Sequence, residues 1–369
     1  MRLAVTGGGT GGHVFPAIEV GLAARASGCE VAYFGSQRGI EGAQAARVNF
    51  PFHGFPSEPL YRLASPRGLK SAARMAIAMS RALRSLQEER IERMFSSGGY
   101  ASAPVVHAAR KLGIPYVLHE QNSVPGRTNV LLSAGAEAVC TVFESAARHF
   151  PRSRVERTGM PVRGAFRSSG QGRLPTAHSL ESASPIVLVV GGSQGSIALN
   201  DMAVATAVRM ATTPVHWLHL TGTTHFESSR ASLERMAVKG PYEIKAYLDE
   251  ADMAAAMLSA HVVVCRSGAG TLAELAALRK PSVLVPYPKA FGDHQTENAK
   301  EFEQIGAADL LPQDGLSATT LEARIQAWLD DGTRVRSAES ALAQWDIPDA
   351  IERTLNVVLE KKLLAGALR

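Results

Sequence analysis

Short apolar runs alternate with segments of helical pattern along nearly the whole chain. The apolar runs are rich in Val, Ile and Leu and lie at residues 3–6, 31–34, 93–96, 116–119, 138–142, 186–190, 216–220, 262–265 and 282–286. Helical patterns separate most of them, as at residues 17–26, 102–112, 198–211 and 272–278. Runs that are apolar throughout are typical of parallel strands with helices on both faces. The sequence therefore predicts a doubly wound α/β fold.

The pattern also divides the chain into two halves that begin alike. Residues 3–9 and 187–193 are each an apolar run that leads into glycines. Between the halves, residues 165–184 are rich in Ser, Gly, Pro and Ala and carry no apolar period, as expected of a linker. We expect an N-terminal domain at 1–164 and a C-terminal domain at 185–346. The remaining stretch, 347–369, is expected to be a helix that could return to the N-terminal domain.

The amino-acid composition is that of an ordinary globular protein. Its 369 residues are 46% hydrophobic and 20% charged, which is too apolar for disorder and enough for two cores. A membrane span needs ~20 apolar residues, and no run approaches this length. Glycine interrupts the N-terminus before a signal-peptide core could form. We therefore expect a protein that neither crosses the membrane nor is exported.

The net charge limits the possible partners only slightly, and the cysteines indicate neither a metal site nor a disulfide. The net charge of +5 is a mild bias toward anionic partners such as phosphates, acidic lipids or nucleic acid. Cys29, Cys140 and Cys265 are far apart and lie in or beside apolar runs. This spacing fits neither a metal site nor a disulfide pattern and indicates buried, reduced thiols.

The first candidate site is a glycine-rich loop after the first apolar run. Residues 7–12, Gly-Gly-Gly-Thr-Gly-Gly, match the G-x-G-x-x-G pattern between a strand and a helix. Such glycines let a ligand approach the backbone, and a helix N-terminus favours anions. A nicotinamide dinucleotide site also needs a carboxylate after the second strand, where residues 33–36 are Tyr-Phe-Gly-Ser. The loop favours another closely held ligand, with tight packing alone as the alternative.

Two further glycine loops follow strands in the second half. Residues 191–195, Gly-Gly-Ser-Gln-Gly, also fit the nucleophile elbow of a serine hydrolase, which needs a later acid and a separate histidine. Asp293 and His294 are adjacent instead. Residues 266–271, Arg-Ser-Gly-Ala-Gly-Thr, again join a strand to a helix. Two such helix N-termini suit a diphosphate better than an acyl group, and glycines that serve only as turns remain the alternative.

Glu274 distinguishes a nucleotide-sugar site from a hydrolase. It lies three residues after Thr271, in the first turn of the expected helix. It could be a solvated carboxylate that the helix dipole favours. It could also accept both hydroxyls of a ribose whose phosphates sit at the preceding loop, and a hydrolase has no need of such a group.

Seven motifs in order along the chain identify a family. They are residues 7–16 (GGGTGGHVFP), 98–100 (GGY), 119–122 (HEQN), 161–163 (PVR), 191–195 (GGSQG), 265–274 (CRSGAGTLAE) and 293–299 (DHQTENA). Together they resemble the bacterial peptidoglycan N-acetylglucosaminyltransferases, which convert lipid I to lipid II, over residues 1 to about 350. The resemblance implies the GT-B fold, in which two Rossmann-like domains face a central cleft and the C-terminal one binds most of the donor.

The resemblance also implies which residues bind the donor, UDP-N-acetylglucosamine. They are Thr10, Gly11, Gly12, Asn122, Arg163, Ser193, Leu248, Ala269, Gly270, Thr271, Leu272, Ala273, Glu274 and Gln295. Within this set, residues 10–12 are expected at the sugar-diphosphate side of the donor, and Ser193 at the diphosphate. Glu274 is expected at the ribose and Gln295 at the sugar hydroxyls. Leu248 falls where a family loop reads uracil, although residues 247–253 are slightly longer than in some relatives.

His13 matches a family histidine suspected of acid–base work. The acceptor hydroxyl must lose a proton as it attacks, and a base with a pKa near 7 serves best. A structural histidine that buttresses the loop is the alternative, and Glu120 is a rival base with a simpler structural explanation. The chain departs from the family at Met160, where Asn is usual. This change removes a polar side chain from the expected cleft edge.

The leaving diphosphate must be stabilised as it departs. Helix N-termini, backbone N–H groups and Arg163 can do this without a metal. The sequence has no Asp-x-Asp pair, the simplest clamp for Mg²⁺ or Mn²⁺. We therefore predict transfer without a metal or other cofactor. The resemblance implies inversion at the sugar, with the C4 hydroxyl of the N-acetylmuramyl unit of lipid I as acceptor.

Lipid I is a membrane lipid, so the resemblance implies contact with a bilayer. Residues 60–84 interleave apolar and basic side chains: Leu60, Tyr61, Leu63, Leu69, Met75, Ile77 and Met79 with Arg62, Arg67, Lys70, Arg74, Arg81 and Arg84. This mixture suits an anionic membrane surface, although a core-facing helix with a basic edge is the alternative. We expect a peripheral enzyme on the cytoplasmic face of the inner membrane, with cell-wall synthesis proteins as possible partners.

Two other classes of function use the same glycine loops. One is a non-catalytic protein that binds a nucleotide sugar or nucleic acid. Aromatic residues make up only 6% of the chain and form no stripe with basic residues, which argues against nucleic acid. The other is a GT-B glycosyltransferase that acts on a different lipid or a small molecule.

Overall fold

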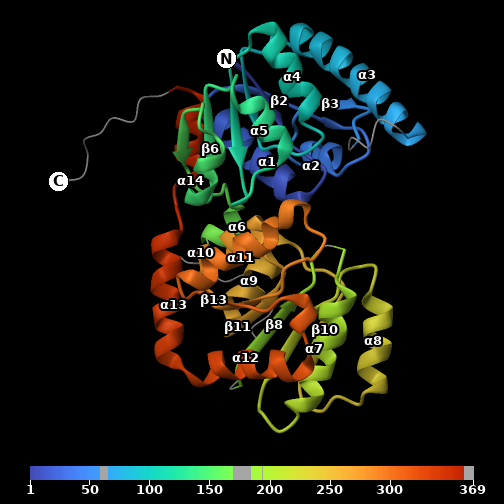
Figure 1. The fold of residues 1–369 in the computed structure, drawn as a ribbon, viewed down its shortest axis with the longest axis vertical. Coiled ribbons are helices and arrows are strands. Elements are labelled where there is room, and N and C mark those ends of the chain that lie inside the picture. The colour runs from blue at the N-terminus through green and yellow to red at the C-terminus, as the bar shows by residue number, and fades with distance from the viewer. Residues whose placement is uncertain (59–64, 169–183, 193, 361–369) are drawn as a thin grey trace, which may run out of the picture. The chain divides into compact units, whose positions relative to one another are not determined.

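The computed structural model describes residues 1–58, 65–168, 184–192 and 194–360, which fold into two compact units (Figure 1). The N-terminal unit combines Met1–Arg163 with the chain from Asp349 onward, and the C-terminal unit is Gly164–Pro348. The predicted linker begins with a short helix, α6 (Gly164–Ser168), that belongs to the C-terminal unit. Residues 169–183 of that linker lie outside the described residues.

The N-terminal unit is built on a seven-stranded parallel sheet of order β3-β2-β1-β4-β5-β6-β7. Its strands are β1 (Arg2–Thr6), β2 (Glu30–Ser36), β3 (Phe52–Phe55), β4 (Arg93–Ser96), β5 (Tyr116–Glu120), β6 (Ala138–Thr141) and β7 (Val155–Arg157). Its helices are α1 (Gly11–Ala26), α2 (Glu41–Arg47), α3 (Pro66–Glu88), α4 (Ala103–Leu112), α5 (Arg127–Ser133), the 3-10 helix η1 (Glu144–His149) and α14 (Ala350–Val358).

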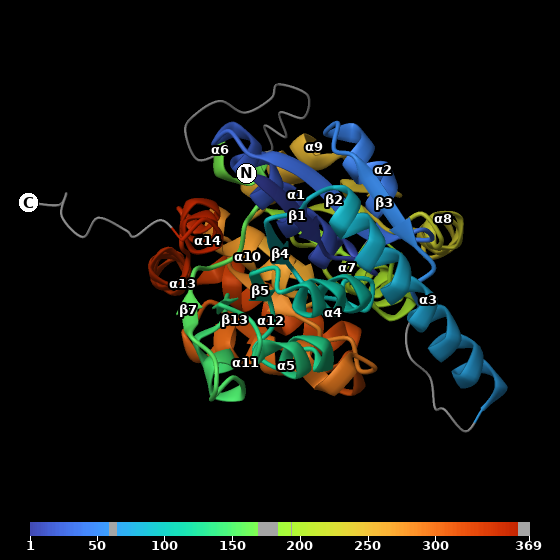
Figure 2. The same ribbon diagram turned by 90° about the horizontal axis from the view of Figure 1, so that it is seen from above.

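Both faces of this sheet are buried, which explains why its strands are apolar throughout. Leu3 and Val5 of β1 pack in one core with residues of α1 and α14. Ala4, between them, packs in a second core with residues of α3 and α4. Successive side chains of a strand point to opposite faces, so a strand covered on both sides has no polar alternation. Figure 2 shows α3 running past α4 and reaching beyond it.

The C-terminal unit repeats this plan with a six-stranded parallel sheet of order β10-β9-β8-β11-β12-β13. Its strands are β8 (Ile186–Val190), β9 (His216–Leu220), β10 (Tyr242–Lys245), β11 (Val262–Cys265), β12 (Ser282–Leu284) and β13 (Ala308–Leu310). Besides α6, its helices are α7 (Ile197–Arg209), α8 (Phe226–Arg235), α9 (Glu250–Ser259), α10 (Ala269–Leu278), η3 (Phe291–Asp293), α11 (His294–Gln304), η4 (Gln313–Gly315), α12 (Ala318–Asp330) and α13 (Gly332–Trp345).

Each sheet has one point where its strand order reverses. In the N-terminal unit it lies between β1 and β4, and in the C-terminal unit between β8 and β11. Chains that leave neighbouring strands at such a point turn to opposite faces of the sheet, and this opens a crevice beyond the carboxyl ends of the strands. The glycine loops singled out in the sequence begin at these four strand ends.

The predicted α/β class is confirmed, and the nine predicted strands are present within a few residues. The sequence missed β3, β7, β10 and β13, which are the two edge strands of each sheet. Three of the four, β3, β7 and β10, are mostly half-buried, so they lack the fully apolar run that marked the inner strands. Helix α1 also begins earlier than predicted, because its first turns contain glycines and Pro16.

Three further findings bear on the sequence predictions. Cys29, Cys140 and Cys265 are all buried and unpaired, as predicted. None of the helices in the described parts of the chain combines the length and hydropathy of a membrane span. Within the same residues, no group of three or more His, Cys, Asp or Glu side chains is arranged to hold a metal ion.

Candidate active site

The first glycine loop, between β1 and α1, is held by backbone contacts with the loop after β4. The Gly8 N–H donates to the Gly98 carbonyl at 3.2 Å. A Cβ on Gly99 would lie 2.1 Å from the Gly8 carbonyl oxygen, and Gly99 has a φ of +85°. Only glycine allows both this conformation and this close approach. The 98–100 motif therefore supports the first loop at the point where the strand order reverses.

His13 lies in the first turn of α1 and is fixed by Ser97, which follows β4. Its Nδ1 is 2.8 Å from the Ser97 carbonyl oxygen, and the Ser97 hydroxyl donates to the His13 carbonyl at 2.5 Å. A carbonyl oxygen can only accept, so Nδ1 carries the hydrogen. In the neutral ring Nε2 then holds the lone pair that a general base needs.

The same Ser97 carbonyl joins a third loop to the site. Gln121, directly after β5, donates from Nε2 to this oxygen at 2.6 Å. One carbonyl therefore accepts hydrogen bonds from the loops that follow β1 and β5. The sequence singled out His13 and the 119–122 motif separately, and Ser97 is the residue that brings them together. Its position beside Gly98 was the available signal.

Glu120 organises the rest of the loop after β5. Its Oε1 accepts from the Asn122 N–H at 3.0 Å, and its Oε2 accepts from the Gly126 N–H at 3.1 Å and from Asn129 Nδ2 at 2.8 Å. Burial raises the pKa of Glu120, and these hydrogen bonds oppose that shift. Both oxygens are occupied by the loop itself, which favours the structural explanation of Glu120 over its role as a base.

Arg163 lies beside the first helix of the N-terminal unit. The Arg163 guanidinium lies over the ring of Phe15 in α1, 4.8 Å from its centroid. Thr10 and Gly12 are exposed at the start of that helix, and Gly11 is half-buried. Met160, which replaces the usual Asn, is buried. The side chain at this position is therefore packed, and its place at the edge of a cleft stays a prediction.

In the C-terminal unit, Arg266 joins the loops that surround the second reversal point. Its Nη1 donates to the carbonyls of Val285 and Pro286 at 3.0 and 2.8 Å. Its Nη2 donates to Ser196 Oγ at 2.6 Å and to Gln313 Oε1 at 2.7 Å. Burial lowers the pKa of Arg266. The sequence named the motif around Arg266 but assigned this residue no role.

A second set of bonds places Gln295 beside the same loops. The Ser267 hydroxyl donates to the Gln295 carbonyl at 2.7 Å, and Asn298 Nδ2 donates to the Ser267 carbonyl at 3.2 Å. The Gln295 side chain accepts from the Tyr287 N–H at 2.9 Å. The start of α11 is thereby held against the loop that follows β11.

Helix α10 carries the six consecutive residues predicted to bind phosphate and ribose. Gly270, Thr271 and Glu274 are half-buried, whereas Ala269, Leu272 and Ala273 are buried. The Leu272 N–H donates to the Gly268 carbonyl at 3.0 Å. Glu274 follows Gly270 by four residues and so shares its helix face. The structure thus makes Glu274 available at one face of α10, and Leu272 and Ala273 part of the core.

The two remaining predicted positions are less informative. Leu248 is buried in the loop between β10 and α9, next to the exposed Tyr247. Ser193 lies outside the described residues. Its neighbour Gly195 is described, and a Cβ there would lie 2.0 Å from the Thr221 carbonyl oxygen. The second glycine loop is therefore pressed against the loop after β9.

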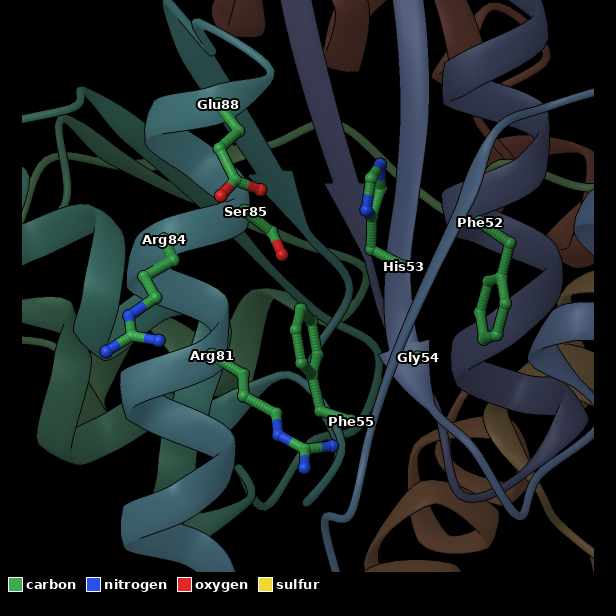
Figure 3. A pocket seen from close by; sticks show the side chains of 8 residues that line it. All are labelled: Phe52, His53, Gly54, Phe55, Arg81, Arg84, Ser85 and Glu88. Carbon is green, nitrogen blue, oxygen red and sulfur yellow. The ribbon is translucent and has the colours of Figure 1, made fainter.

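A separate cleft lies between the edge strand β3 and the C-terminal half of α3 (Figure 3). Its volume is about 360 Å³. The residues that line it are Phe52, His53, Gly54, Phe55, Arg81, Arg84, Ser85 and Glu88. The sequence named Arg81 and Arg84 as part of the basic segment but gave no sign of this cleft.

Comparison with known proteins places the chain in a family. The N-terminal and C-terminal domains of glycosyltransferase family 28 match residues 3–141 and 186–354. A UDP-N-acetylglucosamine–N-acetylmuramyl-(pentapeptide) pyrophosphoryl-undecaprenol N-acetylglucosamine transferase of Desulforudis audaxviator is 34% identical over 97% of this chain and 98% of its own length. A transferase of the same name from Bacillus anthracis is 34% identical over 97% of this chain and 98% of its own length. The chain belongs to this family of glycosyltransferases.

Solved structures agree with this assignment. The crystal structure of Acinetobacter baumannii MurG matches the transferase with a TM-score of 0.77 and 28% identity, over 97% of this chain and 99% of that one. A UDP-GlcNAc 2-epimerase from Neisseria meningitidis has a TM-score of 0.72 at 12% identity, over 98% and 100% of the two chains, and shows the shared fold alone. The predicted family and GT-B fold class are confirmed, whereas the assigned site residues stay predictions.

The buried histidines predict how the stability of the transferase depends on pH. His219 in β9 has Nε2 3.1 Å from Asn200 Oδ1, and its Nδ1 is 2.8 Å from the Tyr242 hydroxyl. Burial lowers the pKa of His219 to about 4, and it lowers the pKa of His119 to about 4 as well. Between the usual pKa of ~6.5 and 4, only the unfolded chain binds these protons. Stability should therefore fall as the pH falls through this window.

Chemical denaturation at several pH values measures this effect. The wild type should lose unfolding free energy between pH 7 and 4. In His219→Gln this loss should be smaller by on the order of 3 kcal/mol. Tyr242→Phe removes a hydrogen bond but keeps the titrating ring, so it should retain the wild-type dependence. Equal pH dependence in wild type and His219→Gln would contradict the assignment.

Proposed function

We propose that this glycosyltransferase moves N-acetylglucosamine from UDP-N-acetylglucosamine to the C4 hydroxyl of the N-acetylmuramyl unit of lipid I, forming lipid II with inversion at the sugar. The observation that carries the proposal is the full-length match to transferases named for this donor and acceptor, at 34% identity over 97% of the chain. The geometry of each unit supports it with groups suited to one part of the reaction.

The C-terminal unit offers the chemistry for the donor. Displacement of UDP builds negative charge on the diphosphate, which helix N-termini and backbone N–H groups stabilise. Helix α10 begins directly after the Arg266–Gly268 loop, and Arg266 fixes that loop to Ser196 at the start of α7. Glu274 can accept ribose hydroxyls one turn further along α10. Arg266 already makes four hydrogen bonds within the protein, so we assign it a supporting role.

The N-terminal unit offers the base. His13 donates a hydrogen bond from Nδ1 to the Ser97 carbonyl, so the basic lone pair lies on Nε2. Nε2 can then accept the proton of the attacking hydroxyl. As the acceptor oxygen bonds to the anomeric carbon, the bond to UDP breaks and the hydroxyl proton passes to Nε2. We assign no metal to this step, because helix N-termini and backbone N–H groups can stabilise the departing diphosphate.

Release of UDP from UDP-N-acetylglucosamine tests the function directly. We expect release and formation of a lipid II product only when a lipid I analogue is present, with a rate that persists in excess chelator. Release that requires a different acceptor would indicate another glycosyltransferase, and binding without release would indicate a non-catalytic protein. Loss of turnover on chelation that Mg²⁺ restores would contradict the metal-free account.

His13→Ala should lower kcat by about 10²–10⁴, the usual contribution of a general base. The affinity for UDP-N-acetylglucosamine, measured by calorimetry, should change little because His13 itself is not among the residues predicted to bind the donor. His107→Ala, on α4, serves as the matched control. A kcat loss below about tenfold in His13→Ala would exclude this residue as the base.

The expected membrane contact is a peripheral one through part of the predicted basic segment, at the cytoplasmic face of the inner membrane. Residues 60–63 lie outside the described residues. In α3, Met75, Ala78, Ala82 and Leu86 form the buried stripe of a core-facing helix. Leu69 and Ile77 are nevertheless 63% and 47% exposed, and Arg67 and Lys70 of the same helix are exposed as well. A core-facing helix explains the stripe but not these exposed apolar side chains.

Charge reversal separates the two explanations. Arg67→Glu with Lys70→Glu should weaken binding to vesicles of anionic phospholipid, measured by sedimentation, by about 30-fold, since each basic residue near such a surface contributes ~1 kcal/mol. Arg74 is a poorer choice because it pairs with Glu58 at 2.8 Å. Arg235→Glu with Lys239→Glu makes the same charge change on the C-terminal unit. If both double variants sediment like the wild type, α3 is not the membrane contact.

A further inference from the structure

Glu41 is a buried carboxylate that the reaction described above does not use. It is the first residue of α2 and is 0% exposed. Its Oε1 accepts the Gly9 N–H at 3.0 Å. Its Oε2 is buried and has no hydrogen-bond partner among the described residues. A buried polar atom without a partner is unfavourable, so the hydrogen bond from the Gly9 N–H to Oε1 offsets part of the cost of burying this carboxylate.

Glycines on two sides make room for this carboxylate. A Cβ on Gly8 would lie 1.9 Å from Oε1, and a Cβ on Gly39 would lie 1.5 Å from Oε2. Gly39 is exposed, and the three atoms nearest to its hypothetical Cβ all belong to Glu41. Glycine at position 39 is therefore explained by Glu41 alone. At position 8, within the G-x-G-x-x-G pattern, a side chain would collide with Glu41. Glycine is therefore needed there whether or not a ligand approaches the loop.

The bond to Gly9 fixes the turn that leads to His13. Gly9 has a φ of +92°. Glycine adopts this conformation readily but also adopts many others, so Gly9 alone does not fix the turn. The next residue, Thr10, accepts the N–H groups of His13 and Val14 through its carbonyl at 3.1 Å each. The loop is thus held by Glu41 at Gly9, by Gly98 at Gly8, and by the Tyr33 hydroxyl at Gly7, at 2.5 Å.

We propose that Glu41 is a positioning residue for the transfer reaction. By accepting the Gly9 N–H, its carboxylate orders the turn from Gly8 to Thr10 and so sets the start of α1, from which His13 projects. The effect on activity rests on the proposed role of His13, whereas the effect on the loop does not. The carboxylate also withdraws the Gly9 N–H from any substrate phosphate.

The exposed glycine provides a sharp test of this coupling. Glu41→Ala should lower kcat about tenfold or more, because small displacements of a catalytic group cost up to ~10²-fold. Gly39→Ala should lower kcat similarly, since its new methyl group displaces the carboxylate. Gly39→Ala combined with Glu41→Ala should be no slower than Glu41→Ala alone. Glu41→Gln keeps an acceptor oxygen and should recover most of kcat.

Hydrogen exchange of the Gly9 amide reads the same contact without any substrate. Exchange should accelerate at least tenfold in Glu41→Ala and in Gly39→Ala, and remain slow in Glu41→Gln. This measurement needs no substrate, so it tests the contact between Glu41 and Gly9 even if the chain acts on another acceptor. Failure of the Glu41 proposal can therefore be told apart from failure of the proposed function. Asp309→Asn is the control, because Asp309 is a buried carboxylate of the C-terminal unit, paired with Arg334 at 2.6 Å.

Four results would overturn the proposal. The first is a kcat of Glu41→Ala within twofold of wild type in a folded protein. The second is additive loss in the double variant, which would mean that Gly39→Ala acts without the carboxylate. The third is unchanged exchange at Gly9. Loss of activity in Glu41→Gln equal to that in Glu41→Ala would likewise exclude the hydrogen bond as the cause.

Discussion

The Ser97 carbonyl oxygen is the contact on which the N-terminal half of the site depends. It accepts from His13 Nδ1 at 2.8 Å and from Gln121 Nε2 at 2.6 Å. These two donors follow β1 and β5, and Ser97 itself follows β4, so one acceptor joins three strand ends. The contact also decides the chemistry of His13, because a ring that donates from Nδ1 presents a basic Nε2. A fold that merely placed the three loops near each other would leave the ring free to choose the other tautomer.

The two glycine loops look alike in sequence, but their surroundings have opposite charge. Behind the first loop, the carboxylate of Glu41 accepts the Gly9 N–H. Beside the second, the guanidinium of Arg266 donates to Ser196, which caps α7. A positive group near a helix N-terminus favours a bound diphosphate, whereas a buried carboxylate disfavours one. This difference supports binding of the nucleotide diphosphate by the C-terminal unit and a positioning role for the first loop.

Exposure explains which parts of the fold the sequence could predict. The inner strands β1, β4, β5, β8 and β11 are covered on both faces, so their composition is apolar throughout and unmistakable. The edge strands β3, β7 and β10 are half-exposed and short, and their mixed residues resemble those of loops. For the site, glycine motifs and the family resemblance predicted the loops that surround each reversal point. They did not predict Ser97 or Arg266 as the residues that hold those loops together.

By itself, the sequence determined the α/β class, the family and the identity of the glycine loops, because these depend on residue type and local spacing. Only the tertiary structure decided which loops meet. Glu41 is 32 residues from Gly9, Ser97 is 84 residues from His13, and Arg266 is 70 residues from Ser196. Hydrogen bonds between such distant residues follow from strand order and register, which bring the carboxyl ends of parallel strands to one edge of the sheet. No local pattern in the chain records that order.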